Sequence, residues 1–273
     1  MNERSLSYSF AFVWTFGASA LILAGIGLTE WFKPHASSDI VNVGAWHLLS
    51  FLLASFGLVR VYAARRSSPD AFGLRRTHLV LPVLGLALGF TLYAPIESLR
   101  GLIEKWSPTP ASDLAAEAAL LSTDTPARTV LVVAVAACVM PLAEELFFQG
   151  ALFGALRRSH PPLGAAVIAA LSFVISHIDL REWLPSLTLA VVLSHLRLVS
   201  GSLLPPLAVH VGFNATTIVV VLTGFGSVSA PTVLPRLVNL ASWAMVGTLV
   251  YGVQRLALAS PEAAQARAQD TDE

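Results

Sequence analysis

Two adjacent carboxylates, Glu144 and Glu145, stand within the apolar stretch PLAEELFFQGALFGAL. An ionisable group at the centre of a transmembrane helix costs roughly 2.5 to 3.5 kcal/mol, so two in succession require a reason. They could be a buried polar pair that neighbouring helices satisfy, or the helix could end before them. Because the apolar run continues to Arg157, we place both inside the membrane. A carboxylate kept from bulk water can act as a general base that takes a proton from a water molecule.

Helix geometry gives the two carboxylates different roles. Adjacent residues of an α-helix point about 100° apart, so both cannot face the same point. We take Glu144 as the reacting carboxylate and Glu145 as a supporting one. Gln149 follows Glu145 by four residues, which predicts that the Gln149 amide donates a hydrogen bond to the Glu145 carboxylate.

Two further apolar segments carry polar side chains at helical spacing. FVISH places Phe173 beside His177, and HVGFN places His210 on one helix face with Asn214. A single histidine in a span is most often an interhelical hydrogen bonder, but two such segments beside the Glu pair favour a shared site. Glu144 and His177 are then the predicted base. Asn214 and a His210 ring N–H are the predicted oxyanion donors. Phe173 is expected either to fix the His177 ring or to be ordinary helix packing.

The composition indicates an integral membrane protein. Of the 273 residues, 55% are hydrophobic and 12% are charged, and the mean hydropathy is +0.69. Basic and acidic residues number 17 each, so no global basic surface favours nucleic acid, which we do not expect as a partner. The single cysteine, Cys138, excludes an intramolecular disulfide and gives no cysteine-based metal site.

Apolar stretches long enough to cross the hydrocarbon core, about 20 residues, predict an all-α bundle of about eight transmembrane helices. They lie near residues 7–28, 41–62, 79–96, 129–155, 163–180, 184–199, 203–224 and 234–256. The first contains a possible signal-peptidase site, but its apolar run continues, so we keep it as a span. Residues 1–260 are expected to form one membrane domain, residues 97–128 to lie as helices at the interface, and the polar tail 261–273 to be disordered.

These boundaries put the polar side chains at different depths in the membrane. Glu144 falls near the middle, His177 toward the outer end of its helix, and His210 slightly to the cytoplasmic side. Either the helix of His177 runs on through Trp183, or some of the helices are tilted or broken.

The distribution of positive charges predicts the orientation. With a cytoplasmic N-terminus, that side holds eleven Lys and Arg residues: Arg4, Arg60, Arg65, Arg66, Arg75, Arg76, Arg157, Arg158, Arg197, Arg255 and Arg267. The other side holds six: Lys33, Arg100, Lys105, Arg128, Arg181 and Arg236. We therefore expect a multi-pass protein of a bacterial inner membrane with both termini in the cytoplasm.

The three motifs resemble those of the CPBP family of intramembrane proteases, which includes CAAX prenyl proteases of the Ras-converting type and bacterial Abi proteins. The family pattern of EExxxR, FxxxH and HxxxN corresponds here to EELFFQ, FVISH and HVGFN, within about residues 130–220. One position departs from it. Gln149 stands where the pattern has arginine, so an ion pair to Glu145 would become a hydrogen bond from a neutral donor.

The resemblance implies an endopeptidase that works on a membrane-associated or lipidated substrate. The substrate would be a protein or peptide, such as one with a prenylated C-terminus, a bacteriocin leader or a C-terminal sorting tail, and membrane lipid would be the other partner. We expect no cofactor, although zinc held by Glu144, His177 and His210 is a competing explanation. The competing function is a non-catalytic carrier or scaffold that binds through the buried polar cluster.

Overall fold

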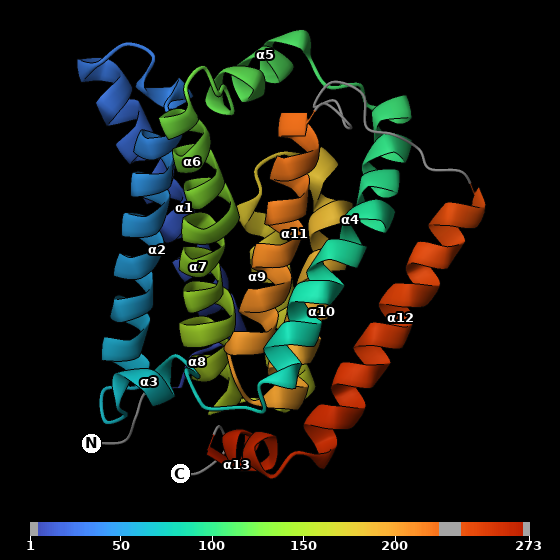
Figure 1. Ribbon diagram of the computed structural model, residues 1–273. Coiled ribbons are helices and arrows are strands. Elements are labelled where there is room, and N and C mark those ends of the chain that lie inside the picture. The colour runs from blue at the N-terminus through green and yellow to red at the C-terminus, as the bar shows by residue number, and fades with distance from the viewer. Residues whose placement is uncertain (1–4, 224–235, 270–273) are drawn as a thin grey trace.

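The computed structural model describes residues 5–223 and 236–269, and within these ranges the chain is helical with no strand (Figure 1). The first half comprises α1 (Tyr8–Phe32), η1 (Ala36–Ser38), α2 (Ile40–Tyr62), α3 (Ser68–Ala71), α4 (Val80–Trp106), α5 (Ala111–Leu120) and α6 (Pro126–Ala134). The second comprises η2 (Val135–Val139), α7 (Met140–Glu145), η3 (Leu146–Leu152), α8 (Phe153–Arg157), α9 (Pro162–Ser176), η4 (Leu180–Glu182), α10 (Trp183–Ser200), α11 (Leu204–Thr223), α12 (Arg236–Ala259) and α13 (Pro261–Gln269). The predicted all-α bundle is confirmed.

Within the described ranges, seven helical segments are long and apolar enough to cross a membrane. They correspond to seven of the eight expected spans. The fourth is a continuous segment, Pro126–Arg157, that runs from α6 through α8. The expected fifth span is the shorter helix α9, which has 15 residues. The chain is therefore a multi-pass integral membrane protein.

The Glu pair lies between two π-helical turns of the fourth span. The turn η2 ends at Val139, the six-residue α7 carries both carboxylates, and η3 begins at Leu146. A π-helical turn bonds each N–H to the carbonyl five residues back, so it holds an extra residue and shifts the register of side chains beyond it. The directions of side chains along this span therefore differ from those of an uninterrupted α-helix.

The helix that leads to His177 does not run on through Trp183, so the first of the two alternatives for the depth conflict is wrong. α9 ends at Ser176, and His177 has an extended backbone with φ −83° and ψ 111°. The Trp183 indole donates a hydrogen bond to the His177 carbonyl at 2.8 Å, and this bond ties the end of α9 to the start of α10.

The prediction of interfacial helices over residues 97–128 is wrong for both ends of that range. α4 continues to Trp106, so residues 97–106 extend a span. Arg100 in this stretch pairs with Glu182 at 2.8 Å, which lets charged residues remain within the bundle. α5 has no buried residue and lies across one end of the bundle (Figure 1), and α6 begins the next span at Pro126.

The predicted disorder of the polar tail 261–273 is wrong for Pro261–Gln269, which form α13. The Ser260 hydroxyl accepts a hydrogen bond from the Ala263 N–H, and Ala263 is fully buried. Arg267 donates to the carbonyls of Val199 and Ala257. These contacts compensate the low hydrophobicity on which the prediction rested. Residues 270–273 lie outside the described ranges.

The backbones of α4 and α11 are in direct contact, which fixes the helix that carries His210. A Cβ atom on Gly89 would lie 2.2 Å from the Val209 carbonyl oxygen, and one on Gly212 would lie 2.6 Å from the Leu86 carbonyl oxygen. Only glycine permits such an approach, as is common where membrane helices pack closely.

Candidate active site

His210 joins both carboxylates of the Glu pair. Its Nδ1 lies 2.9 Å from Glu145 Oε1, and its Nε2 lies 3.6 Å from Glu144 Oε2. The His210 and Glu145 side chains are almost completely buried. Because a carboxylate can only accept, Nδ1 carries the hydrogen of the bond to Glu145. The structure thus brings together three of the residues that the motifs predict for one site.

A second histidine, His47 of α2, lies on the other side of Glu144. Its Nε2 is 2.7 Å from Glu144 Oε1, and each of the two side chains is 13% exposed. The ring also stands edge-on to Phe51 with centroids 4.8 Å apart. Sequence reasoning missed His47, because it belongs to no motif. The signal that could have found it is its position as the single ionisable side chain between Ile40 and Val59, in the apolar part of its span.

His177 is near the Glu pair but is not bonded to it. Its Nδ1 is 3.0 Å from the Phe173 carbonyl oxygen, and its ring lies 5.0 Å from that of Phe173. The carbonyl is an acceptor, so it holds the hydrogen on Nδ1 and leaves Nε2 of a neutral ring as an acceptor. Phe173 also stands 5.6 Å from the His210 ring, so it packs between the two histidines.

Glu144, His47 and His177 line one cavity of about 240 Å³. Its walls come from α1, which contributes Ser19 and Ile22, and from α2, α7 and the end of α9. The volume is sufficient for several water molecules. The carboxylate, an imidazole in contact with it and a second imidazole nearby therefore line one cavity of the bundle.

The predicted hydrogen bond from Gln149 to Glu145 is absent from the described residues. The fully buried Gln149 instead donates from Nε2 to the Ser194 hydroxyl of α10 at 2.9 Å. The reason is η3, which begins between Glu145 and Gln149 and changes the helical register on which the prediction relied. Gln149 therefore supports the fourth span through α10 and not through the carboxylate.

Asn214 holds the other π-helical turn. Its Nδ2 donates to the Ala136 carbonyl of η2 at 3.0 Å. This bond engages one amide N–H and leaves the second one for another acceptor. Asn214 and His210 share the face of α11 that the sequence predicted, and both point toward the fourth span.

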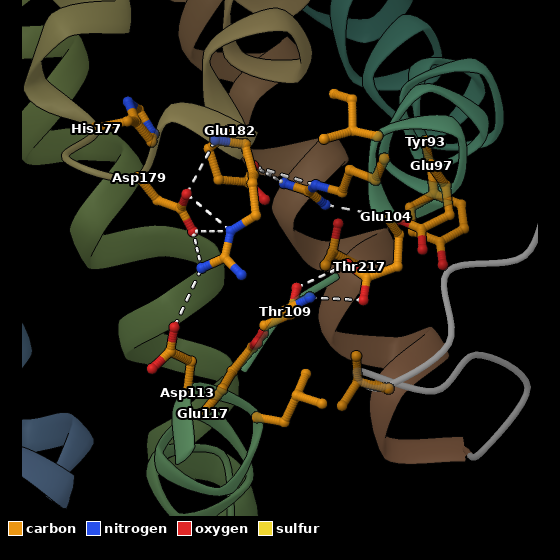
Figure 2. Close-up of a pocket in the computed structure, with 15 residues that line it drawn as sticks. Tyr93, Glu97, Glu104, Thr109, Asp113, Glu117, His177, Asp179, Glu182 and Thr217 are labelled. Atoms are coloured by element: carbon orange, nitrogen blue, oxygen red, sulfur yellow. Dashed lines mark hydrogen bonds and ion pairs between the residues drawn. The ribbon is translucent and has the colours of Figure 1, made fainter. Parts of the chain in front are cut away.

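A second, larger cavity of about 590 Å³ adjoins the site at His177 (Figure 2). It lies at the end of the bundle that α5 crosses, and ion pairs bridge its walls. Arg181 binds Asp179 at 2.6 Å and Asp113 of α5 at 3.1 Å. The Arg181 guanidinium holds the pKa of the Asp179 carboxyl below its usual range. His177 lines both cavities, so the larger one lies next to the site.

The side chains proposed as zinc ligands do not form a ligand set. Among the described residues, no group of three His, Cys, Asp or Glu side chains is arranged to hold a metal ion. The Nδ1 bonds of His210 to Glu145 and of His177 to a backbone carbonyl leave both Nε2 atoms available, which is the arrangement usual for ligating histidines. Glu144, His177 and His210 are nevertheless not gathered around one point in this structure.

Residues 126–216 match the family of type II CAAX prenyl endopeptidases described as Rce1-like. The matched segment contains all three motifs, so the resemblance that they carry is confirmed. No curated protein and no solved structure matches the chain. The family match supports endopeptidase activity of the CAAX type in general, on a protein or peptide within reach of the membrane.

Proposed function

Because residues 126–216 are similar to the Rce1-like CAAX prenyl endopeptidases, we propose that this membrane protein hydrolyses a peptide bond of a membrane-associated or lipidated substrate. The observation that carries the proposal is the 2.7 Å contact between His47 and Glu144 in a cavity that His177 also lines. A carboxylate, two imidazoles and space for water are the components of general-base hydrolysis.

Glu144 is the general base in this proposal. A water molecule in the cavity gives a proton to Glu144 as its oxygen attacks the scissile carbonyl carbon. His47 orients Glu144 through Oε1, while His210 approaches Oε2. This assignment replaces His177 by His47 as the histidine in contact with the base. His177 turns its free Nε2 to the water, and its Nδ1–H remains bonded to Phe173.

The tetrahedral intermediate then requires donors to its oxyanion and a proton for its leaving group. The second N–H of Asn214 is one donor, and the Nε2–H of His210 in its doubly protonated form is the other. Glu144 returns its proton to the departing nitrogen, so the peptide C–N bond breaks to give a carboxylate and an amine. Glu145 keeps His210 in place through the bond to Nδ1.

The proposed orientation places the larger cavity on the outer side of the membrane. The start of α1 and the helix α13 lie at one end of the bundle, and α5 crosses the other end (Figure 1). The arginine-rich segment 60–76 lies at the same end of the bundle as the start of α1. The positive-inside rule assigns this end to the cytoplasm. Polar parts of a substrate would then reach His177 from outside.

The proposal is tested with a fluorogenic peptide that ends in a farnesylated cysteine and three further residues, and with the same peptide lacking the farnesyl group. We expect cleavage of the farnesylated peptide, with the new terminus identified by mass spectrometry. Glu144→Gln should abolish it while the chain stays in the membrane and keeps its melting temperature. Glu262→Gln on α13 is the matched control and should cleave normally. Undiminished turnover in Glu144→Gln would remove Glu144 from the mechanism.

A protein that binds the peptide without cleaving it would instead support a carrier or scaffold. Proteome-wide comparison of membrane protein termini with and without the chain distinguishes a different peptidase specificity from no peptidase activity.

A further inference from the structure

Helix α10 holds Gln149 at two points. The Ser194 hydroxyl accepts from the Gln149 side chain, and Arg197 Nε donates to the Gln149 backbone carbonyl, each at 2.9 Å. Ser194 and Arg197 are three residues apart and so lie on the same face of α10. The residue that replaces the arginine of the family pattern is therefore fixed by a neighbouring helix, which itself supplies an arginine.

The Arg197 side chain is buried against the π-helical turn that follows the Glu pair. It is 1% exposed, and its Cζ lies 4.8 Å from the centroid of Phe153, the residue directly after η3. A buried guanidinium is costly unless hydrogen bonds and favourable ring contacts replace its water. Residues 149–153 supply both a hydrogen-bond acceptor and an aromatic ring to Arg197.

The loop before α4 is shaped to admit this guanidinium. Gly73 has a positive φ of 66°, and a Cβ atom there would lie 2.5 Å from Arg197 Nη2. The Gly73 carbonyl accepts from the Leu203 N–H at 2.8 Å, which fixes the loop against the start of α11. A glycine at this position is thus required both by its backbone conformation and by Arg197.

The carbonyl that Arg197 holds belongs to the turn that sets the direction of Glu145. η3 begins at the residue after Glu145, so its register determines how α7 and α8 are joined. Asn214 holds the Ala136 carbonyl of η2 in the same way at the other end of α7. Each π-helical turn that flanks the Glu pair is therefore tied to a side chain from an adjacent helix.

We propose that Arg197 is a positioning residue of the site: from α10 it supplies the buried guanidinium that the family pattern places at position 149. It acts on the backbone of η3 and thereby fixes Glu145 and the bond from Glu145 to His210. The kinetic part of this inference rests on the proposed function, whereas the geometric part does not.

The geometric part is tested by ¹⁵N NMR of histidine-labelled protein in detergent, with the His210 signal identified in a His210→Gln variant. Arg197→Gln should shift the Nδ1 resonance of His210, because Glu145 moves relative to it. Ser200→Ala removes another buried side-chain hydrogen bond of α10, to the Leu196 carbonyl, and should leave the resonance in place. An unshifted resonance in folded Arg197→Gln overturns the inference, whether or not the chain is a protease.

The kinetic part is tested with the farnesylated peptide. Arg197→Gln should lower kcat by roughly 10- to 100-fold with little change in KM, as a misplaced catalytic group does. Arg197→Lys keeps the charge but loses the Nε donor, so its kcat should be nearly as low as that of Arg197→Gln. If Arg197→Gln does not fold, Arg197→Lys serves as the test variant. Combining Arg197→Gln with Gln149→Arg should return the His210 resonance and part of kcat. If the His210 resonance stays shifted in the double variant, the inference that Arg197 takes the role of an arginine at position 149 is wrong. If the unmutated chain cleaves no peptide, the proposed function fails while the NMR test stands.

Discussion

His47 of α2 and Glu144 of α7 face each other across a helix interface, with Nε2 and Oε1 2.7 Å apart. Their segments are almost a hundred positions apart in the sequence, and His47 lies outside the family match. The base of the proposed reaction therefore takes its nearest histidine from a helix that the motifs do not include.

Replacing His47 should slow the chemical step more than it weakens substrate binding. We expect His47→Gln to lower kcat by roughly 100-fold or more, because general acid–base partners contribute factors of this order, with KM nearly constant. The measurement is steady-state cleavage of the farnesylated peptide per folded protein.

The matched control for this variant is His35→Asn, which changes an exposed histidine and tolerates its left-handed backbone. A His47→Gln variant with normal kcat, together with an inactive His177→Gln variant, would return the base partner to His177 as the sequence suggested.

The sequence was sufficient to predict that Glu144, Glu145 and His210 lie together, because each motif is local and the helices that carry them are apolar. The contact of His47 with Glu144 depends on how α2 packs, which no spacing within one segment encodes. The role of Gln149 was mispredicted for a local reason. The rule that residues four apart share a helix face assumes α-helical pitch, and no residue pattern in LFFQGAL indicates a π-helical turn.

The two partners of Gln149 predict how its variants behave. Gln149→Leu leaves the buried Ser194 hydroxyl without its partner and should reduce the free energy of unfolding by about 1 to 3 kcal/mol. Adding Ser194→Ala to it should recover much of that loss, because both polar groups are then gone. Denaturant unfolding in detergent gives the three values.

Gln149→Arg alone should destabilise the chain more than Gln149→Leu does, because it buries a second guanidinium close to Arg197. If it is instead more stable and more active than the unmutated chain, position 149 is an arginine site as in the family pattern, and Arg197 has another role.

The orientation of the bundle is testable with single cysteines in a Cys138→Ala background. Ala64→Cys, in the arginine-rich segment, should be protected from an impermeant thiol reagent added to intact cells. Ser112→Cys on α5, at the other end of the bundle, should be labelled. The reverse pattern would place both chain ends outside, and permeabilised cells provide the control for reactivity.

Zinc content separates the two explanations of water activation. We expect purified chain to hold much less than one zinc per molecule and to keep its cleavage rate after dialysis against a chelator. A stoichiometric zinc whose removal stops cleavage, and whose return restores it, would require Glu144 and the histidines to rearrange around the ion.

The two π-helical turns affect how the fourth span accepts a change in its number of residues. In a regular α-helix, the loss of one residue rotates everything beyond it by about 100°. Here, a deletion within Val135–Val139 would let that turn give up its extra residue and return to α-helical pitch, so α7 would keep nearly its direction relative to α6. Glu144 would then still face His47. The π-helical turns are therefore the places in this span where relatives could lose one residue and retain the site.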